Sequence, residues 1–275
     1  MLPWDKKFIN EYIPKNPKTI FYSDGSSNVQ NVCENIIRNF LDQIINSGIN
    51  NKDLYQISSP NLLCLKCEDD EKFIPIEKLR KAKEFMQVKS MNVKVLYISE
   101  GEKIRVDGFN TLLKLTEETG EKQFIWIAAK NLTVIPKTIL SRFSKVKLPH
   151  PNKREIMDHI SQYSFKDSQL EEFLIENPSY FQKDDFEKDI LNFTQWLKTK
   201  QISNLDKDQF ADFIEFLMFV HKKSVLQNGL KFKQKILKLQ EIKKELKLPN
   251  NLNLDVLKLK VNSVSYTHLR AHETD

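Results

Sequence analysis

The sequence predicts an α/β protein in which a domain built on a parallel sheet is followed by helices. Two observations carry this prediction. Residues 123–129 (QFIWIAA) form a continuous apolar run, which is typical of a strand that is buried on both faces. Beyond Pro149-His150-Pro151, apolar residues recur at helical spacing in one segment after another. The chain therefore divides into a sheet-forming first part and a helical second part.

The first part alternates apolar runs with segments of helical pattern. Strands are expected at residues 19–22, 62–65, 93–98 and 123–129 and around Val146. A helix over residues 29–45 follows the first strand. A second helix is expected after Asp107, whose carboxylate would cap it, with an apolar side that includes Leu112 and Leu115. Pro136 suits the first turn of a short helix that ends near Arg142.

The second part reads as a series of amphipathic helices. They are expected over residues 153–162, 168–176, 184–198, 206–227 and 231–248, with Asn152 as a cap of the first. The helix over residues 206–227 has a wide apolar face, which predicts burial on more than one side, in a core or between subunits. Its apolar residues are Phe210, Phe213, Ile214, Phe216, Leu217, Phe219 and Val220. The helix over residues 231–248 could lie on a membrane surface, but a bundle helix is favoured.

Composition bounds the function classes. The 275 residues suggest about two domains, and 40% hydrophobic with 29% charged residues indicate a globular chain. We find no apolar run of the roughly 18 residues that a membrane span needs. The start of the chain has no secretory pattern, which leaves the cytoplasm as the expected location. The net charge of +6 has much of its excess between Lys222 and Lys260. It suggests DNA binding or a solvated helix face, and the solvated face is favoured.

Three cysteines, Cys33, Cys64 and Cys67, are too few for the zinc sites known from proteins. Such a site needs about four ligands, and neither a second Cys-x-x-Cys nor a well-placed histidine is present. We therefore expect buried free thiols and no metal.

Two motifs in register then point to a family. Residues 112–118 (LLKLTEE) resemble the LLKxLEE helix of the clamp-loader branch of AAA+ ATPases. Residues 138–143 (TILSRF) resemble the T-[IL]-x-S-R-C motif of that branch, with Phe143 in place of the usual cysteine. The predicted strand over residues 123–129 lies between them, as in the family. The resemblance implies an AAA+ P-loop-like parallel sheet domain.

The same resemblance gives the place of the nucleotide site, and that site has lost its chemistry. A P-loop needs glycines, a lysine for the phosphates and a hydroxyl for magnesium. After the first strand, residues 23–31 have one glycine, and no Lys or Arg occurs between Ser23 and Ile37. Asp24 would even repel a phosphate. Ser99 stands where a magnesium-binding carboxylate is expected, and the sensor position reads Ala128-Ala129. We expect little ATP binding or hydrolysis, no cofactor and no active site of the chain's own.

A clamp-loader pattern with a lost nucleotide site and a kept Ser-Arg pair resembles the delta-prime subunits of the bacterial DNA polymerase III clamp loader. Further similar segments are Leu2-Pro3-Trp4, residues 59–62 (SPNL) and residues 74–80 (IPIEKLR). The resemblance is clear over about residues 1–160. Departures are Phe143 and the absence of the cysteine-rich zinc module that many relatives carry.

The resemblance also implies a domain order. Residues 1–150 would form an AAA+ RecA-like domain with a degenerate nucleotide site, residues 151–203 a helical lid, and residues 204–263 an all-helical collar that assembles a pentamer. Residues 264–275 resemble translated sequencing-adapter read-through and are left out of the fold prediction. The collar is accordingly expected to be truncated near Ser263.

The function implied is that of a non-hydrolysing clamp-loader subunit that helps load the sliding clamp on primed DNA. Arg142 would act in trans, as an arginine finger on the ATP of a neighbouring subunit, and Ser141 would position its loop. The implied partners are the motor subunits and the delta subunit in a hetero-pentamer, and through them the clamp and primed DNA. Two alternatives stay open: an active motor ATPase of the same loader, and a basic helical nucleic-acid-binding protein.

Overall fold

The computed structural model describes residues 1–45, 48–49, 52–68, 71–165, 167–199, 202, 205–228, 230–246 and 253–266. The chain divides into two compact units, Met1–Glu155 and Ile156–Asp275. The predicted boundary between lid and collar, at residues 203–204, lies outside the described residues. Most of the predicted tail, residues 267–275, lies outside them as well.

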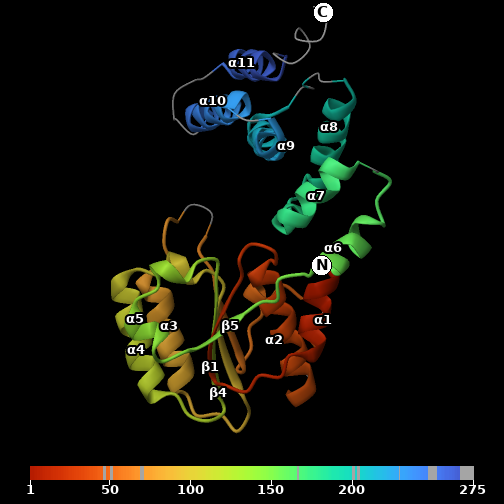
Figure 1. Ribbon diagram of the computed structural model, residues 1–275. Coiled ribbons are helices and arrows are strands. Elements are labelled where there is room, and N and C mark those ends of the chain that lie inside the picture. The colour runs from red at the N-terminus through yellow and green to blue at the C-terminus, as the bar shows by residue number, and fades with distance from the viewer. Residues whose placement is uncertain are drawn as a thin grey trace, which may run out of the picture. The chain divides into compact units, whose positions relative to one another are not determined.

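The first unit is a parallel sheet between two layers of helices. Its strands, among the described residues, are β1 (Lys18–Tyr22), β2 (Leu62–Leu65), β3 (Lys94–Ile98), β4 (Gln123–Ala129) and β5 (Ser144–Lys147). They form one five-stranded sheet in the order β2-β3-β4-β1-β5, with every pair parallel. Its helices are α1 (Pro3–Glu11), α2 (Val29–Ile45), α3 (Ile76–Gln87), α4 (Val106–Glu118) and α5 (Lys137–Leu140). Figure 1 shows α1 and α2 on one face of the sheet and α3, α4 and α5 on the other.

Alternate residues of each central strand face opposite helical layers, as the two-residue period of a strand requires. Ile20 of β1, together with Ile125 and Ile127 of β4, packs with the side chains of α3 and α4. Phe21 and Trp126, which alternate with them, pack with α1 and α2. Both faces of β3 and β4 are therefore buried, and this explains the unbroken apolar runs in the sequence.

Lys94 and Gly108 fix the positions of the neighbouring helices α3 and α4. Lys94, at the start of β3, is buried and donates from Nζ to the carbonyl oxygens of Phe85 (2.5 Å) and Val88 (2.6 Å) at the carboxyl end of α3. A cation suits the negative end of a helix. In α4, a Cβ at Gly108 would lie 2.6 Å from Cδ1 of Leu79, so glycine permits the close approach of α3 and α4.

The second unit is helical throughout its described residues. Its helices are α6 (Lys153–Ile160, which begins at the end of the first unit), α7 (Ser168–Glu176), α8 (Phe186–Thr199), α9 (Lys207–Asn228), α10 (Leu230–Leu246) and α11 (Leu254–Tyr266). None of the helices in the described part of the chain is long and apolar enough to span a bilayer. The parallel α/β sheet domain followed by helices confirms the predicted fold class.

Aromatic side chains form the core between α7, α8 and α9. Phe193 of α8 stacks on Phe216 of α9, with ring centroids 4.6 Å apart, and Phe173 of α7 meets the edge of Phe216 at 5.2 Å. Phe213 is 1% exposed and lies against Trp196. The face predicted on residues 206–227 is thus buried inside this chain, and no second subunit is needed to cover these rings.

Several local predictions were wrong. Asp107 does not cap α4: the helix starts at Val106, and Arg105 occupies the N-cap. The Asp107 carboxylate instead accepts from the N–H of Gly108. Pro136 occupies the N-cap of α5 and not its first turn. No helix was predicted after residue 248, although Leu254, Leu257 and Val261 recur at helical spacing in α11. The sequence prediction also excluded Val264, which is buried in α11 with 6% exposure.

Other local predictions held. Asn152 and Glu155 form reciprocal hydrogen bonds at the start of α6: the Asn152 side chain accepts from the N–H of Glu155 (3.0 Å), and the Glu155 carboxylate accepts from the N–H of Asn152 (2.9 Å). This capping box explains why the chain turns into a helix directly after Pro151. The predicted end at residue 162 was two residues too late, since α6 ends at Ile160.

Candidate functional site

The loop between β1 and α2 has the position of a phosphate-binding loop, but its backbone is bound to its own side chains. Oγ of Ser23 accepts from the N–H groups of Gly25 and Ser27, both at 3.2 Å. Oδ1 of Asp24 accepts from the N–H of Ser26 at 3.3 Å. Gly25 has φ of 102°, which permits the tight turn. In a P-loop, backbone N–H groups of this kind cradle phosphates, and here they are already occupied.

Asp24 places a carboxylate at this loop. Besides the N–H of Ser26, it accepts from Oγ of Ser26 at 2.7 Å, and its Oδ2 lies 3.2 Å from both Nζ of Lys147 and Nδ1 of His150. Partial burial raises the pKa of Asp24, but the hydrogen bonds from Ser26, Lys147 and His150 outweigh it and hold that pKa well below its ordinary value. A negative charge therefore stays in the loop at neutral pH.

A second contact holds the loop from the amino-terminal helix. Nε1 of Trp4 donates to the carbonyl oxygen of Ser26 at 3.1 Å, and the indole is 2% exposed. The Leu2-Pro3-Trp4 segment thus fixes the conformation of the loop as well as covering the sheet.

The carboxyl ends of β3 and β4 lack metal-binding and sensing groups. Ser99 is buried, and its N–H and Oγ both bond to the carbonyl oxygen of Leu65, at 3.0 and 3.3 Å. The Glu100 carboxylate accepts from the N–H of Cys67 and pairs with Lys103, so it is engaged in holding the backbone. Ala128 and Ala129 are buried apolar residues of β4. The polar groups of Ser99 and Glu100 are therefore already bonded within the chain.

Arg142 lies just after α5, on the turn that leads into β5. Its side chain is 43% exposed; Nη1 donates to the carbonyl oxygen of Thr138 at 3.1 Å, and Nη2 lies 3.3 Å from Oε1 of Glu117. Oγ of Ser141 donates to the same Thr138 oxygen at 3.0 Å. Ser141 and Arg142 thereby satisfy one of the free carbonyl groups at the end of α5. Phe143, which follows, is buried in the core at 4% exposure.

Arg142 and the degenerate loop lie at opposite ends of two neighbouring strands, β5 and β1. β1 and β5 pair in parallel from Thr19↔Ser144 to Tyr22↔Lys147. Arg142 precedes the paired residues of β5, whereas the loop follows those of β1. The two are therefore separated by at least the length of the paired strands, on the order of 13 Å at about 3.3 Å per residue. From this position the guanidinium cannot serve the loop of its own chain.

The described residues contain no cluster of three or more His, Cys, Asp or Glu side chains that could hold a metal ion. Cys33 and Cys67 are buried and Cys64 is partly buried, all as free thiols. Burial raises the pKa of each of the three thiols, so none is poised as a thiolate ligand.

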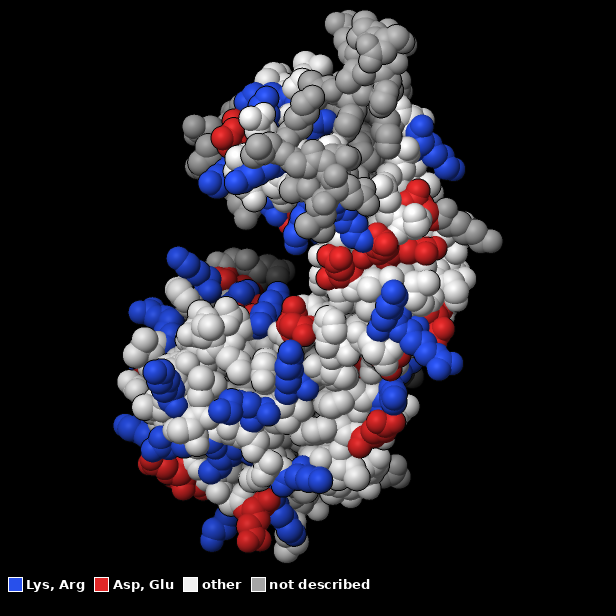
Figure 2. All heavy atoms as spheres, viewed as in Figure 1, with Lys and Arg blue, Asp and Glu red and all other residues white. Residues whose placement is uncertain are grey.

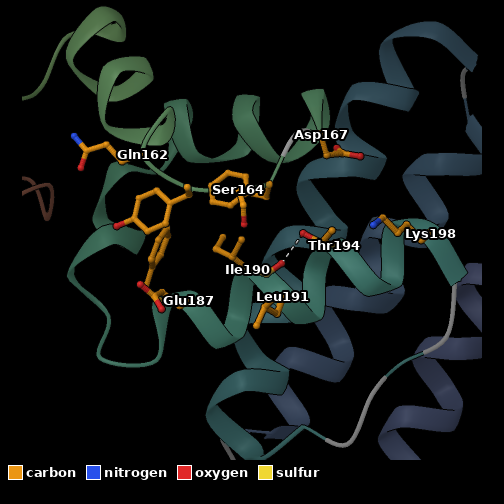
Figure 3. Close-up of a pocket in the computed structure, with 11 residues that line it drawn as sticks. Gln162, Ser164, Asp167, Glu187, Ile190, Leu191, Thr194 and Lys198 are labelled. Atoms are coloured by element: carbon orange, nitrogen blue, oxygen red, sulfur yellow. Dashed lines mark hydrogen bonds between the residues drawn. The ribbon is translucent and has the colours of Figure 1, made fainter.

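The second unit has a cavity of about 590 Å³ between α8 and the segment that joins α6 to α7. Figure 3 shows Glu187, Ile190, Leu191, Thr194 and Lys198 along α8, with Oγ1 of Thr194 bonded to the Ile190 carbonyl at 2.8 Å. Glu187 lies toward one end of the cavity and Lys198 toward the other. The charged side chains do not converge on one point, and we assign no ligand to this cavity.

The fold and the loop define the class of the first unit: a parallel α/β domain whose loop after β1 contains no lysine. Residues 20–152 match the family model described as DNA polymerase III, delta subunit. The matched segment covers the loop, both motifs and all five strands but for the first two residues of β1, so the first unit is similar to this DNA polymerase III subunit family.

Solved structures were also compared with the chain. A DNA polymerase III gamma subunit-related protein from Thermotoga maritima has 12% identity and a TM-score of 0.41, over 94% of this chain and 96% of that one. The RuvB Holliday junction branch migration motor of Thermotoga maritima has 12% identity and a TM-score of 0.39, over 89% and 74%. Similarities at this level carry no functional argument. No curated protein matches the sequence of this chain.

Sequence reasoning missed the partners of the site residues. The sequence assigned no partner to His150, which contacts Asp24 from 126 positions away. It assigned none to Glu117 either, which pairs with Arg142. For His150 only the order of strands could have given a signal, since parallel pairing of β1 with β5 brings the residues after both strands together.

Proposed function

We propose that this chain is a non-hydrolysing clamp-loader subunit of the delta-prime type. The family match of residues 20–152 supports the assignment to a clamp loader. One observation supports the lack of hydrolysis: the loop in the nucleotide position is bound to its own Ser23 and Asp24 side chains. ATP would have to displace these bonds and approach the Asp24 carboxylate. The loop itself has no lysine whose attraction for a phosphate would offset the loss of these bonds and the repulsion by Asp24.

In this proposal Arg142 acts in trans on the ATP of a neighbouring subunit. It precedes β5, at the end of the strands that lies away from the loop of its own chain. Its side chain is exposed and is held by contacts with Glu117 and Thr138. A guanidinium set against a transferring phosphate stabilises charge that develops in the transition state. To reach a phosphate, Arg142 would exchange Glu117 for the new anion. Ser141, bonded to the same carbonyl as Arg142, is a positioning residue.

The partners follow from the proposed subunit type. They are the motor subunits and the delta subunit of a hetero-pentamer, and through the assembly the sliding clamp and primed DNA. Replication machinery of this kind would place the chain in the cytoplasm. The helical second unit, with the proposed lid before residue 203 and the proposed collar after it, would supply the assembly surface.

The test is reconstitution of the chain with clamp-loader motor and delta subunits. Arg142→Ala should lower clamp- and DNA-stimulated ATP hydrolysis at one partner site. Arginine fingers contribute roughly 10³–10⁵ in rate in well-studied NTPases. Because the other sites stay intact, the total rate should fall modestly and clamp loading should fall more. Arg142→Lys should rescue little, because lysine lacks the planar fork.

Arg105→Ala is the matched control, since Arg105 is also an exposed arginine in an ion pair, 3.8 Å from Asp107. It should leave both activities unchanged. Circular dichroism should show that all variants are folded. Hydrolysis and loading at the unaltered level in both Arg142 variants would reduce Arg142 to a surface residue and remove the proposed mechanism.

The alternative of a basic nucleic-acid-binding protein has less support. The basic excess between Lys222 and Lys260 lies in the second unit, where several of its lysines pair with carboxylates, as Lys223 does with Glu172. On the viewed face of the first unit, Figure 2 shows Lys and Arg side chains dispersed, with acidic side chains among them. An electrostatic nucleic-acid surface is expected to gather its cations on one face. Tight and strongly salt-dependent DNA binding by the isolated chain would favour this alternative over the proposed one.

A further inference from the structure

The Asp24 carboxylate sits in a cage of donors that come from two segments of the chain. Ser26 supplies an N–H at 3.3 Å and a hydroxyl at 2.7 Å from the loop itself. Lys147 and His150 supply Nζ and Nδ1, each at 3.2 Å, from the end of β5 and the segment that follows. One carboxylate thus collects four donor contacts, two of them from residues more than 120 positions away.

The sheet explains why Lys147 and His150 reach the loop. Tyr22, the last residue of β1, pairs with Lys147, and the N–H of Leu148 donates to the carbonyl oxygen of Tyr22 at 2.8 Å. The chain after β5 therefore runs beside the loop that follows β1. Backbone pairing fixes the position of Lys147 and the path of the chain toward His150, and neither depends on Asp24.

The chemistry of the cage is that of a phosphate site. A backbone N–H, a hydroxyl, an ammonium and an imidazole N–H are the groups that bind the oxygens of phosphate in proteins. They also hold the Asp24 side chain ionised, as the direction of its pKa shift indicates. Asp24 keeps 33% of its side-chain surface exposed, so an anion from solvent can reach this position once the carboxylate is removed.

We propose that Ser26, Lys147 and His150 form an anion site for phosphate or pyrophosphate, which this chain fills with its own Asp24 carboxylate. The carboxylate takes the place of a nucleotide phosphate, holds the loop in its turn conformation and excludes phosphate ligands. Asp24 thereby holds the loop without a ligand, whereas an active relative of the fold would hold its loop with a bound nucleotide. This goes beyond the proposed function, because it concerns the loop of the isolated chain and holds with or without a loader assembly.

The test removes the carboxylate and offers pyrophosphate, at matched ionic strength, to the isolated full chain. Wild type should show no saturable binding by calorimetry. Asp24→Ala should bind pyrophosphate saturably, with a rise in Tm and a change in the emission of Trp4, whose Nε1 bonds to the Ser26 carbonyl. Adding Lys147→Ala or His150→Gln should weaken this binding about tenfold each, which is about 1.4 kcal/mol, because each change removes one donor to the anion.

Asp53→Ala is the matched control. The Asp53 carboxylate makes the same kind of turn, accepting from the N–H of Tyr55 at 3.0 Å, but belongs to another loop of the unit. Its removal should create no pyrophosphate binding. Asp24→Asn covers the case in which alanine unfolds the loop: it keeps the acceptor for Ser26, removes the charge, and should gain more Tm from pyrophosphate than wild type does.

Pyrophosphate binding no stronger in Asp24→Ala and Asp24→Asn than in wild type would overturn the proposal. So would binding that survives loss of both Lys147 and His150. Neither result bears on Arg142, because no partner subunit or hydrolysis enters this experiment.

Discussion

Nη2 of Arg142 lies 3.3 Å from Oε1 of Glu117, which joins the end of α4 to the turn after α5. The two residues belong to the two sequence motifs that carry the family resemblance, 25 positions apart. Both side chains are largely exposed, at 43% and 64%, so the pair is screened by water. The contact orients the guanidinium, and an exposed pair of this kind can be exchanged, as the proposed role of Arg142 in trans requires.

The first prediction concerns the stability of this pair. Glu117→Gln should change the free energy of unfolding by less than about 0.5 kcal/mol, because exposed ion pairs contribute little. Phe143→Ala, two residues from Ser141, should cost about 3–5 kcal/mol, since the ring is 4% exposed within the core. Urea unfolding of both variants measures the difference. A cost above about 2 kcal/mol for Glu117→Gln would show that the pair is structural and that Arg142 is not free to leave it.

The second prediction is that the isolated chain has negligible affinity for magnesium-ATP and no ATPase activity. The loop N–H groups are occupied, Asp24 is ionised, and Ser99 and Ala128 offer no metal-binding or sensing group. Calorimetric titration checks the affinity, with a clamp-loader motor subunit as the positive control. Micromolar binding that substitutions at Gly25 or Asn28 abolish would contradict the prediction.

The third prediction concerns Asp189, which is 2% exposed near the start of α8. Burial, with a contribution from the Asp212 carboxylate, raises the pKa of Asp189 from 3.8 to about 6, although Lys183 lowers it. The folded state therefore binds this proton more tightly than the unfolded state. The contribution of Asp189 to stability is full below about pH 4 and is lost as pH rises through about 6.

Asp189→Asn should remove the loss of stability that Asp189 causes as pH rises. Relative to wild type, the variant should gain on the order of 2 kcal/mol at pH 7.5 and little at pH 4, because a neutral amide has no charge to bury. Urea unfolding of both proteins across this pH range gives the difference directly, and other carboxylates cancel in it. If the substitution changed the free energy of unfolding equally at both pH values, ionising Asp189 in the folded protein would not cost stability, and the prediction would be wrong.

The fourth prediction concerns the aromatic core of the second unit. Phe213→Ala should cost about 3–5 kcal/mol, because the ring is 1% exposed and packs against Phe193 and Trp196 with centroids 6.0 and 5.7 Å apart. Leu191→Ala is the control: Leu191 is 69% exposed on α8 and its truncation should stay within about 0.5 kcal/mol. Near-ultraviolet circular dichroism of the unit follows both. Similar costs for the two variants would mean that α9 is not a core helix.

Much of the fold could be predicted because burial leaves a periodic pattern in the sequence. The run at residues 123–129 became β4 without a shift at either end, and the predicted helices at residues 29–45 and 168–176 became α2 and α7 with the same bounds. Helix starts that depend on one side chain were less reliable. Asp107 was expected at an N-cap, but the backbone enters α4 at Arg105 and the Asp107 carboxylate turns to Gly108.

The sequence by itself determined which chemical groups the candidate site lacks, because a missing lysine or carboxylate is a matter of composition at a known position. It also placed Ser141 and Arg142 between a short helix and a strand. What only the tertiary structure decided is how the remaining groups are used. Asp24 meets Lys147 and His150, and Arg142 meets Glu117, because parallel strand pairing and helix packing bring together segments that are distant in the chain. Such pairings follow from the register of the sheet, and local periodicity does not encode that register.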